Sequence, residues 1–163
     1  MLNQSSLLTE FVLQDQAKHS MTLSIESDLN QISMIRAALG GVLNHFAVAE
    51  SDIFSIQLAV SEIINNILEH GYKDTDGGRV EIRFHLAGAD VQIEISDSAK
   101  PFPVDQVYRL IGEPIPLEDP NEDWPTRGHG IQIVRQIMDS LDMRSDDRGN
   151  HLTLTKRVSL IEP

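Results

Sequence analysis

Residues 58–72 read LAVSEIINNILEHGY, and the rest of the chain is arranged around this segment. At about 100° per residue on a helix, its apolar and polar side chains separate onto two faces. The apolar stripe consists of Val60, Ile63, Ile64 and Ile67. The polar face consists of Glu62, Asn65, Asn66, Glu69 and His70. One face can therefore enter a core, while the other is available for chemistry.

Glu62 and Asn66 are the informative pair on the polar face. Positions i and i+4 of a helix project toward the same point. A carboxylate can accept a proton or position a nucleophile, and an amide oxygen is a suitable ligand for Mg²⁺. Polar helix faces are most often simply solvated, so the case for a site depends on the rest of the chain.

The composition is typical of one globular domain, with 163 residues, 40% hydrophobic and 23% charged. The chain contains no Cys, which excludes disulfides, thiolate zinc sites and a cysteine nucleophile. No apolar run approaches the about 20 residues that span a bilayer, and the first residues lack the order of a signal peptide. We therefore expect a cytoplasmic protein without membrane contact.

The net charge limits the choice of partner. It is −12, from 25 acidic against 13 basic residues, and such a chain is repelled by nucleic acids and anionic lipids. Direct nucleic-acid binding is therefore disfavoured. An anionic small ligand such as a nucleotide would need local backbone N–H groups, a metal ion and a few basic side chains.

Hydrophobic periodicity predicts helices over 29–46, over 51–71 and from 128 onward. Alternating patterns predict strands at 21–25, 79–86, 90–96, 143–145 and 150–158. Ser27 or Asp28 is expected to cap the first helix, and Ser51 or Asp52 the second. Gly71 suits the left-handed conformation that ends helices. The expected apolar side of the last helix is Ile131, Val134, Ile137, Met138 and Leu141.

The order of these elements indicates the fold class. Helices are segregated from hairpins, which favours an α+β two-layer sandwich over a doubly wound parallel sheet. We expect helices on one face of a mixed, mostly antiparallel sheet. Residues 1–20 are interpreted as an N-terminal extension and residues 21–160 as a single domain.

Residues 99–127 differ in character from the rest, because six of the seven prolines lie between Pro101 and Pro125. A short helix is expected near 104–111. Long loops of this kind are usually functional lids or else surface insertions, and both readings remain open from composition alone.

Two further features are chemically informative beside the Glu62 and Asn66 pair. Asp97 follows a predicted strand, where it could accept a hydrogen bond from an exocyclic base amine. Gly128 and Gly130 open a helix whose bare N–H groups and dipole suit phosphate, with Arg127 adding positive charge. Mg²⁺ on Asn66 would bridge the phosphates.

With these motifs in this order, the sequence resembles the GHKL ATP-binding superfamily, and within it the small anti-sigma-factor serine/threonine kinases. The motif residues are Ala59 to Glu62 with Asn66 and His70 to Tyr72, then Asp97 with Lys100 to Phe102, then Gly128 to Arg135 with Met138 and Asp139. The resemblance extends over residues 21–158 and implies the Bergerat-type ATP-binding fold.

The resemblance implies a role for each matching residue. Glu62 corresponds to the catalytic carboxylate, Asn66 to the Mg²⁺ ligand and Asp97 to the adenine-reading aspartate. The implied phosphate loop is Gly128, His129 and Gly130, with Arg127 as a further phosphate contact.

The activity implied is that of an ATP- and Mg²⁺-dependent protein serine/threonine kinase. Its substrate would be an anti-anti-sigma protein of the STAS type, with a sigma factor as a second partner and a homodimer as the assembly. The sequence departs from the family pattern at three positions: Ala99 replaces a usual glycine, Asn150 a usual threonine and Pro103 a frequent aspartate. The first two of these keep an alternative open. The alternative is a nucleotide-gated module that holds its partner without phosphoryl transfer.

Overall fold

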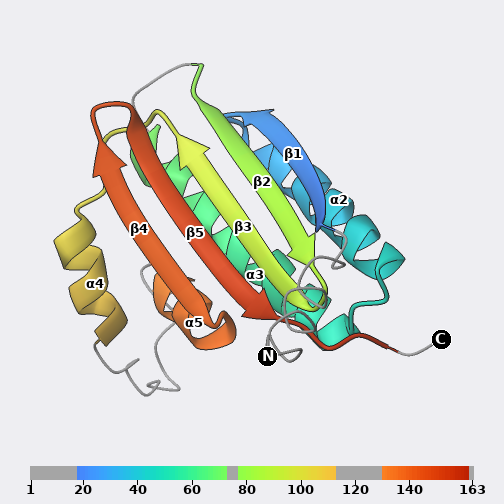
Figure 1. Ribbon diagram of the computed structural model, residues 1–163. Coiled ribbons are helices and arrows are strands. Elements are labelled where there is room, and N and C mark those ends of the chain that lie inside the picture. The colour runs from blue at the N-terminus through green and yellow to red at the C-terminus, as the bar shows by residue number, and fades with distance from the viewer. Residues whose placement is uncertain (1–17, 73–76, 113–129, 162–163) are drawn as a thin grey trace, which may run out of the picture.

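The computed structural model describes residues 18–72, 77–112 and 130–161, which form a five-stranded sheet covered by helices (Figure 1). The strands are β1 (Lys18–Glu26), β2 (Arg79–Ala87), β3 (Asp90–Asp97), β4 (Ser140–Asp146) and β5 (Gly149–Arg157). The helices are α2 (Ile32–His45), α3 (Glu50–Asn66), α4 (Val104–Gly112) and α5 (Gly130–Ile137), with a 3₁₀ turn η1 (Leu29–Gln31) and a π turn η2 (Ile67–Gly71). The predicted N-terminal extension, apart from its last three residues, lies outside the described residues.

The sheet has the strand order β1-β2-β3-β5-β4, and each of these four pairings is antiparallel. In Figure 1, α2, α3 and α5 lie behind the sheet, and α4 stands beyond the β4 edge. The predicted α+β two-layer sandwich is therefore confirmed. Among the helices that the structure describes, none is long and apolar enough to span a bilayer.

The core lies between the sheet and the helices. The predicted apolar stripe of α3 enters it, and Val60, Ile64 and Ile67 are completely buried there. In β2 and β3, alternate side chains point inward, as the period of two requires. Packing against the sheet holds α3 in place. Burial of the apolar face of α3 therefore determines the direction in which its polar face points.

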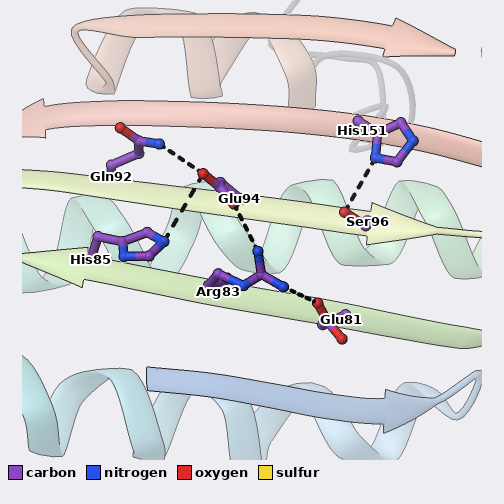
Figure 2. Close-up of polar contacts among 7 residues, drawn as sticks. All are labelled: Glu81, Arg83, His85, Gln92, Glu94, Ser96 and His151. Carbon is purple, nitrogen blue, oxygen red and sulfur yellow. Dashed lines mark hydrogen bonds and ion pairs between the residues drawn. The ribbon is translucent and has the colours of Figure 1, made fainter. Parts of the chain in front are cut away.

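The opposite face of the sheet is polar, and none of the helices that the structure describes lies on it (Figure 2). Glu94 is the centre of its contacts, because it accepts a hydrogen bond from Gln92 at 2.9 Å and pairs with Arg83 at 3.6 Å. Arg83 also binds Glu81 at 2.9 Å, and Ser96 contacts His151 across the strands. These side chains are largely solvated, so such pairs contribute little to stability.

The caps of the first two helical segments differ from each other. Asp28 caps η1 by accepting a hydrogen bond from a backbone N–H, as predicted. The prediction that Ser51 or Asp52 caps the second helix is wrong, because α3 begins at Glu50 and its N-cap residue is Ala49. Asp52 instead accepts a 2.7 Å hydrogen bond from the backbone N–H of Ser159 and so ties α3 to the C-terminal segment.

Leu141 was expected on the apolar side of the last helix, and this is also wrong. The helix ends at Ile137, and β4 begins at Ser140. Leu141 therefore lies in β4, opposite Leu154 of β5, where it is partly buried. An apolar residue at this spacing satisfies both a helical period and the first inward position of the strand.

Candidate functional site

The polar face of α3 carries Glu62 and Asn66, both half-buried. The α-helix ends at Asn66 and continues as η2, in which the backbone N–H of Tyr72 donates to the carbonyl of Ile67 at 3.1 Å. Single π turns of this kind occur frequently at functional sites. Here the turn carries His70 to the same cavity that Asn66 lines.

That cavity has a volume of about 250 Å³ and lies between α3, α5, the segment that leads into α4, and strands β4 and β5. Its walls are mostly apolar, with a few polar groups. The lining residues are Ile63, Asn66, His70, Phe102, Pro103, Val107, Gly130, Ile131, Met143 and Leu152. An apolar slot with few polar groups is typical of a site for a flat organic ligand.

Asp97 ends β3 and is only 6% exposed. Its Oδ1 accepts hydrogen bonds of 2.8 Å from the Asn150 side chain and from the backbone N–H of Ala99. Its Oδ2 is buried and has no hydrogen-bond partner among the described residues. Burial raises the pKa of Asp97, against the two hydrogen bonds and the nearby His151, which act to lower it.

The open oxygen of Asp97 fits a nucleotide base. A buried carboxylate oxygen without a donor is unfavourable in the free protein, and a ligand N–H would satisfy it. The exocyclic amine of adenine is such a donor. The apolar cavity could hold the ring; Asp97 does not line it, but Asn150 connects Asp97 to Phe102, which does.

Glu62 and the start of α5 are in direct contact. A Cβ added at Gly130 would overlap the Glu62 carboxylate, so a larger residue there would displace this carboxylate from its position beside α5. Gly130 is the first residue of α5, where helices present bare N–H groups. The predicted phosphate contacts Arg127, Gly128 and His129 lie outside the described residues.

Asn66 contributes one neutral oxygen toward a possible metal. Among the residues that the structure describes, there is no cluster of three or more His, Cys, Asp or Glu that could hold an ion. This donor set suits Mg²⁺, which retains water and takes ligands from nucleotide phosphates rather than from a protein cage.

A model of the histidine kinase-like ATPase domain matches residues 25–156. The chain belongs to this family. It is 29% identical to the serine-protein kinase RsbW of Bacillus thuringiensis (strain Al Hakam) over 136 residues, which cover 83% of each protein. The RsbW of Bacillus cereus (strain AH820) is 28% identical over 136 residues, which again cover 83% of each protein.

A solved structure shows the same fold. It contains the RsbU and RsbW domains of Rv1364c from Mycobacterium tuberculosis and matches with a TM-score of 0.62 at 21% identity. The match covers 86% of this chain and 32% of that one. The α+β sandwich is therefore that of a histidine kinase-like ATPase domain.

The segment predicted to form a lid, residues 99–127, lies only partly within the described residues. The short helix expected near 104–111 is present as α4, while residues 113–127 lie outside the described residues. Phe102, Pro103 and Val107 line the cavity, so the described part of the lid forms one of its walls.

Gly71 was predicted to end its helix in a left-handed conformation, and its contact with Ala99 gives a different reason for glycine at this position. Gly71 does not have the left-handed conformation expected of it. An added Cβ at Gly71 would come within 2.7 Å of the Ala99 Cβ. The two positions are therefore coupled, because the methyl group at Ala99 is accommodated by glycine at the end of η2.

Two residues of the cavity were not singled out from the sequence. Met143 and Leu152 line the cavity from the last hairpin, where they pair across β4 and β5. Tyr72 accepts a 2.9 Å hydrogen bond from the backbone N–H of Ser98 and donates to the carbonyl of Arg79 at 2.8 Å. The inward alternation of the hairpin could have indicated the first two residues, but the contacts of Tyr72 depend on tertiary structure.

Tyr108 joins the lid helix to the sheet edge, and its removal should loosen the lid. The backbone N–H of Met143 donates to the Tyr108 hydroxyl at 3.0 Å, and this hydroxyl donates to Asp142 at 3.4 Å. In Tyr108→Phe the N–H loses its acceptor, so we expect a loss of about 1 kcal/mol in the free energy of unfolding. Hydrogen exchange should show faster exchange in α4, with Arg109→Gln on the same helix as control. Unchanged α4 exchange in Tyr108→Phe would contradict this role.

Proposed function

We propose that this chain is an ATP- and Mg²⁺-dependent protein serine/threonine kinase. Its substrate is an anti-anti-sigma protein of the STAS type, and a sigma factor is its second partner. Membership of the histidine kinase-like ATPase family supports the use of ATP. The relatives named serine-protein kinase, matched over 83% of this chain, support the transfer of phosphate to a protein.

The observation that carries the proposal is the placement of Glu62 between two parts of one site. Glu62 lies one helical turn from Asn66 and contacts Gly130 at the start of α5. Both of those residues line the cavity. A carboxylate beside the N–H groups of a helix start can act on a hydroxyl group that approaches a bound phosphate.

The chemistry requires mainly positioning and charge stabilisation. A serine or threonine oxygen of the substrate protein forms a bond to the γ-phosphorus, the bond from the β,γ-bridging oxygen to this phosphorus breaks, and ADP leaves. Glu62 orients the hydroxyl and accepts its proton. Asp97 would hold the adenine, and Asn66 would hold Mg²⁺, which would offset the negative charge of the phosphates.

The test is phosphate transfer from γ-labelled ATP. The purified protein is first shown to bind ATP and is then incubated with Mg²⁺ and an extract of the source cells. We expect one labelled band of a small protein, and identification of that band by mass spectrometry should give a STAS-type protein labelled on Ser or Thr. A matched reaction with Glu62→Gln should lack the band.

The alternative, a nucleotide-gated binding module, gives a different result. In that case ATP binds and changes the affinity for the partner protein, but no label appears in any band. Binding of ATP without transfer to the purified partner would therefore exclude the kinase and favour the module.

A further inference from the structure

Asn150, the second residue of β5, is completely buried and makes four hydrogen bonds. Its Oδ1 accepts from the backbone N–H of Phe102 at 2.8 Å and from the Ser145 hydroxyl at 2.6 Å. Its Nδ2 donates to Asp97 Oδ1 at 2.8 Å and to the carbonyl of Lys100 at 3.0 Å.

These four bonds use the full capacity of an amide side chain, which accepts two hydrogen bonds and donates two. They also determine its orientation. The reverse orientation would place an amide N–H₂ against the N–H of Phe102 and an amide oxygen against the Asp97 carboxylate. Asn150 is therefore held in one position, and it has no hydrogen-bonding capacity left for a ligand.

The partners of Asn150 belong to two parts of the site. Asp97 carries the open oxygen, Oδ2, described above. Lys100 and Phe102 belong to the segment 100–102, here called the lid root, which leads into α4; Phe102 also lines the cavity. One buried side chain thus joins the aspartate of the site to the base of its lid. Antiparallel pairing of β3 with β5 places Asn150 directly opposite Asp97.

We propose that Asn150 is a positioning residue that makes the site selective for adenine and couples base binding to the placement of the lid root. This inference rests on the proposed nucleotide-binding function. Asn150 and the Ala99 N–H both occupy Oδ1 of Asp97, which leaves Oδ2 as the accepting oxygen. Adenine carries an amine at C6, which donates to this oxygen, whereas guanine carries a carbonyl there, which the ionised carboxylate repels.

Loss of Asn150 weakens this selectivity in two ways. Without Asn150, Oδ1 of Asp97 keeps only the hydrogen bond from the Ala99 N–H, so the carboxyl group is held less firmly. The same hydrogen bond favours the ionised carboxylate, so its removal favours the protonated form, which can donate to the guanine carbonyl. The lid root loses both of its bonds to Asn150 at the same time.

The test compares the binding of ATP and GTP to the wild type, Asn150→Ala and Asn150→Asp by calorimetry. Asn150→Asp keeps the volume but replaces the amide donors by a second carboxyl group facing Asp97, so it disturbs these hydrogen bonds without opening a cavity. In both variants we expect the preference for ATP over GTP to fall by about tenfold or more, the worth of one hydrogen bond to a charged group. The control is Gln57→Ala, which removes a partly exposed amide contact between α2 and α3, the 2.7 Å bond from Gln57 to the carbonyl of Arg36. It should keep the wild-type preference.

A second measurement needs no nucleotide. In the nucleotide-free wild type, the amide of Phe102 should be protected from hydrogen exchange, as measured by NMR, because Asn150 accepts its hydrogen bond. In Asn150→Ala this protection should disappear, while in Gln57→Ala it should persist.

The outcomes separate this inference from the proposed kinase. A wild-type preference for ATP in Asn150→Ala or Asn150→Asp would overturn it, as would an unprotected Phe102 amide in the wild type. Equal affinity of the wild type for ATP and GTP would also overturn it, even if phosphate were transferred. A wild type that prefers ATP but transfers no phosphate would contradict the kinase and leave the role of Asn150 intact.

Discussion

Glu62→Gln should reduce the rate of phosphoryl transfer by about 10²–10⁴-fold, which is the usual contribution of a general acid–base group. Glutamine keeps the size of the side chain and therefore its contact with Gly130. It cannot accept the proton of the attacking hydroxyl. The affinity for ATP should stay within about twofold, because Glu62 acts on the acceptor hydroxyl and not on the base.

The measurement is single-turnover transfer to the purified substrate protein, with ATP affinity determined separately by calorimetry. Glu69→Gln is the matched control, since Glu69 is an exposed carboxylate of η2, which continues α3, and does not line the cavity. It should transfer phosphate at the wild-type rate. A Glu62→Gln protein with a rate within about fivefold of wild type would show that another group takes the proton.

Asp97→Asn should reduce the affinity for ATP by about 10²-fold, the upper range for a hydrogen bond to a charged group. The two donors on Oδ1 require an acceptor at that position, so the new amide oxygen takes its place. The amide N–H₂ then stands where Oδ2 was and meets the adenine amine donor to donor. Affinity measured by calorimetry should fall, with Asp90→Asn at the exposed start of β3 as control.

The same substitution should raise the free energy of unfolding at neutral pH. Burial raises the pKa of Asp97 above its ordinary value of 3.8, so the folded protein retains the proton to higher pH than the unfolded chain. The wild type therefore loses stability as pH rises from 3.8 toward the folded pKa, and Asp97→Asn does not. The gain in the free energy of unfolding of Asp97→Asn over the wild type should be greatest above the folded pKa of Asp97 and absent below pH 3.8.

Urea unfolding at a series of pH values measures this difference. Asp90→Asn should show no such gain, since Asp90 is solvated and forms a surface pair with Arg157. A stability difference between Asp97→Asn and the wild type that does not change with pH would show that the carboxylate is not destabilised by burial.

Local patterns in the sequence were sufficient for the elements and the fold class. The apolar stripe of residues 58–72 predicted the buried face of α3, and alternation predicted the hairpin of β2 and β3. The segregation of helices from strands then predicted the two-layer sandwich. These inferences succeed because a helical or strand period is a property of neighbouring residues.

Element ends were less predictable, and each error has a tertiary cause. Asp52 has the chemistry of a helix cap, but it binds the backbone of Ser159, far along the chain. Leu141 continues a helical period, but its side chain is partly buried on β4 against Leu154. Gly71 is a residue type that commonly ends helices, but the structure requires glycine there because the methyl group of Ala99 leaves no room for a side chain.

For the site, the sequence by itself determined which residues could act, because Glu62 and Asn66 share one helical face whatever the fold. Tertiary structure alone decided what they meet. The contact of Glu62 with Gly130 depends on how α3 and α5 pack, and the bond from Asn150 to Asp97 depends on the pairing of strands far apart in the chain. Packing and strand register follow from the burial of the whole core, so no local pattern contains them.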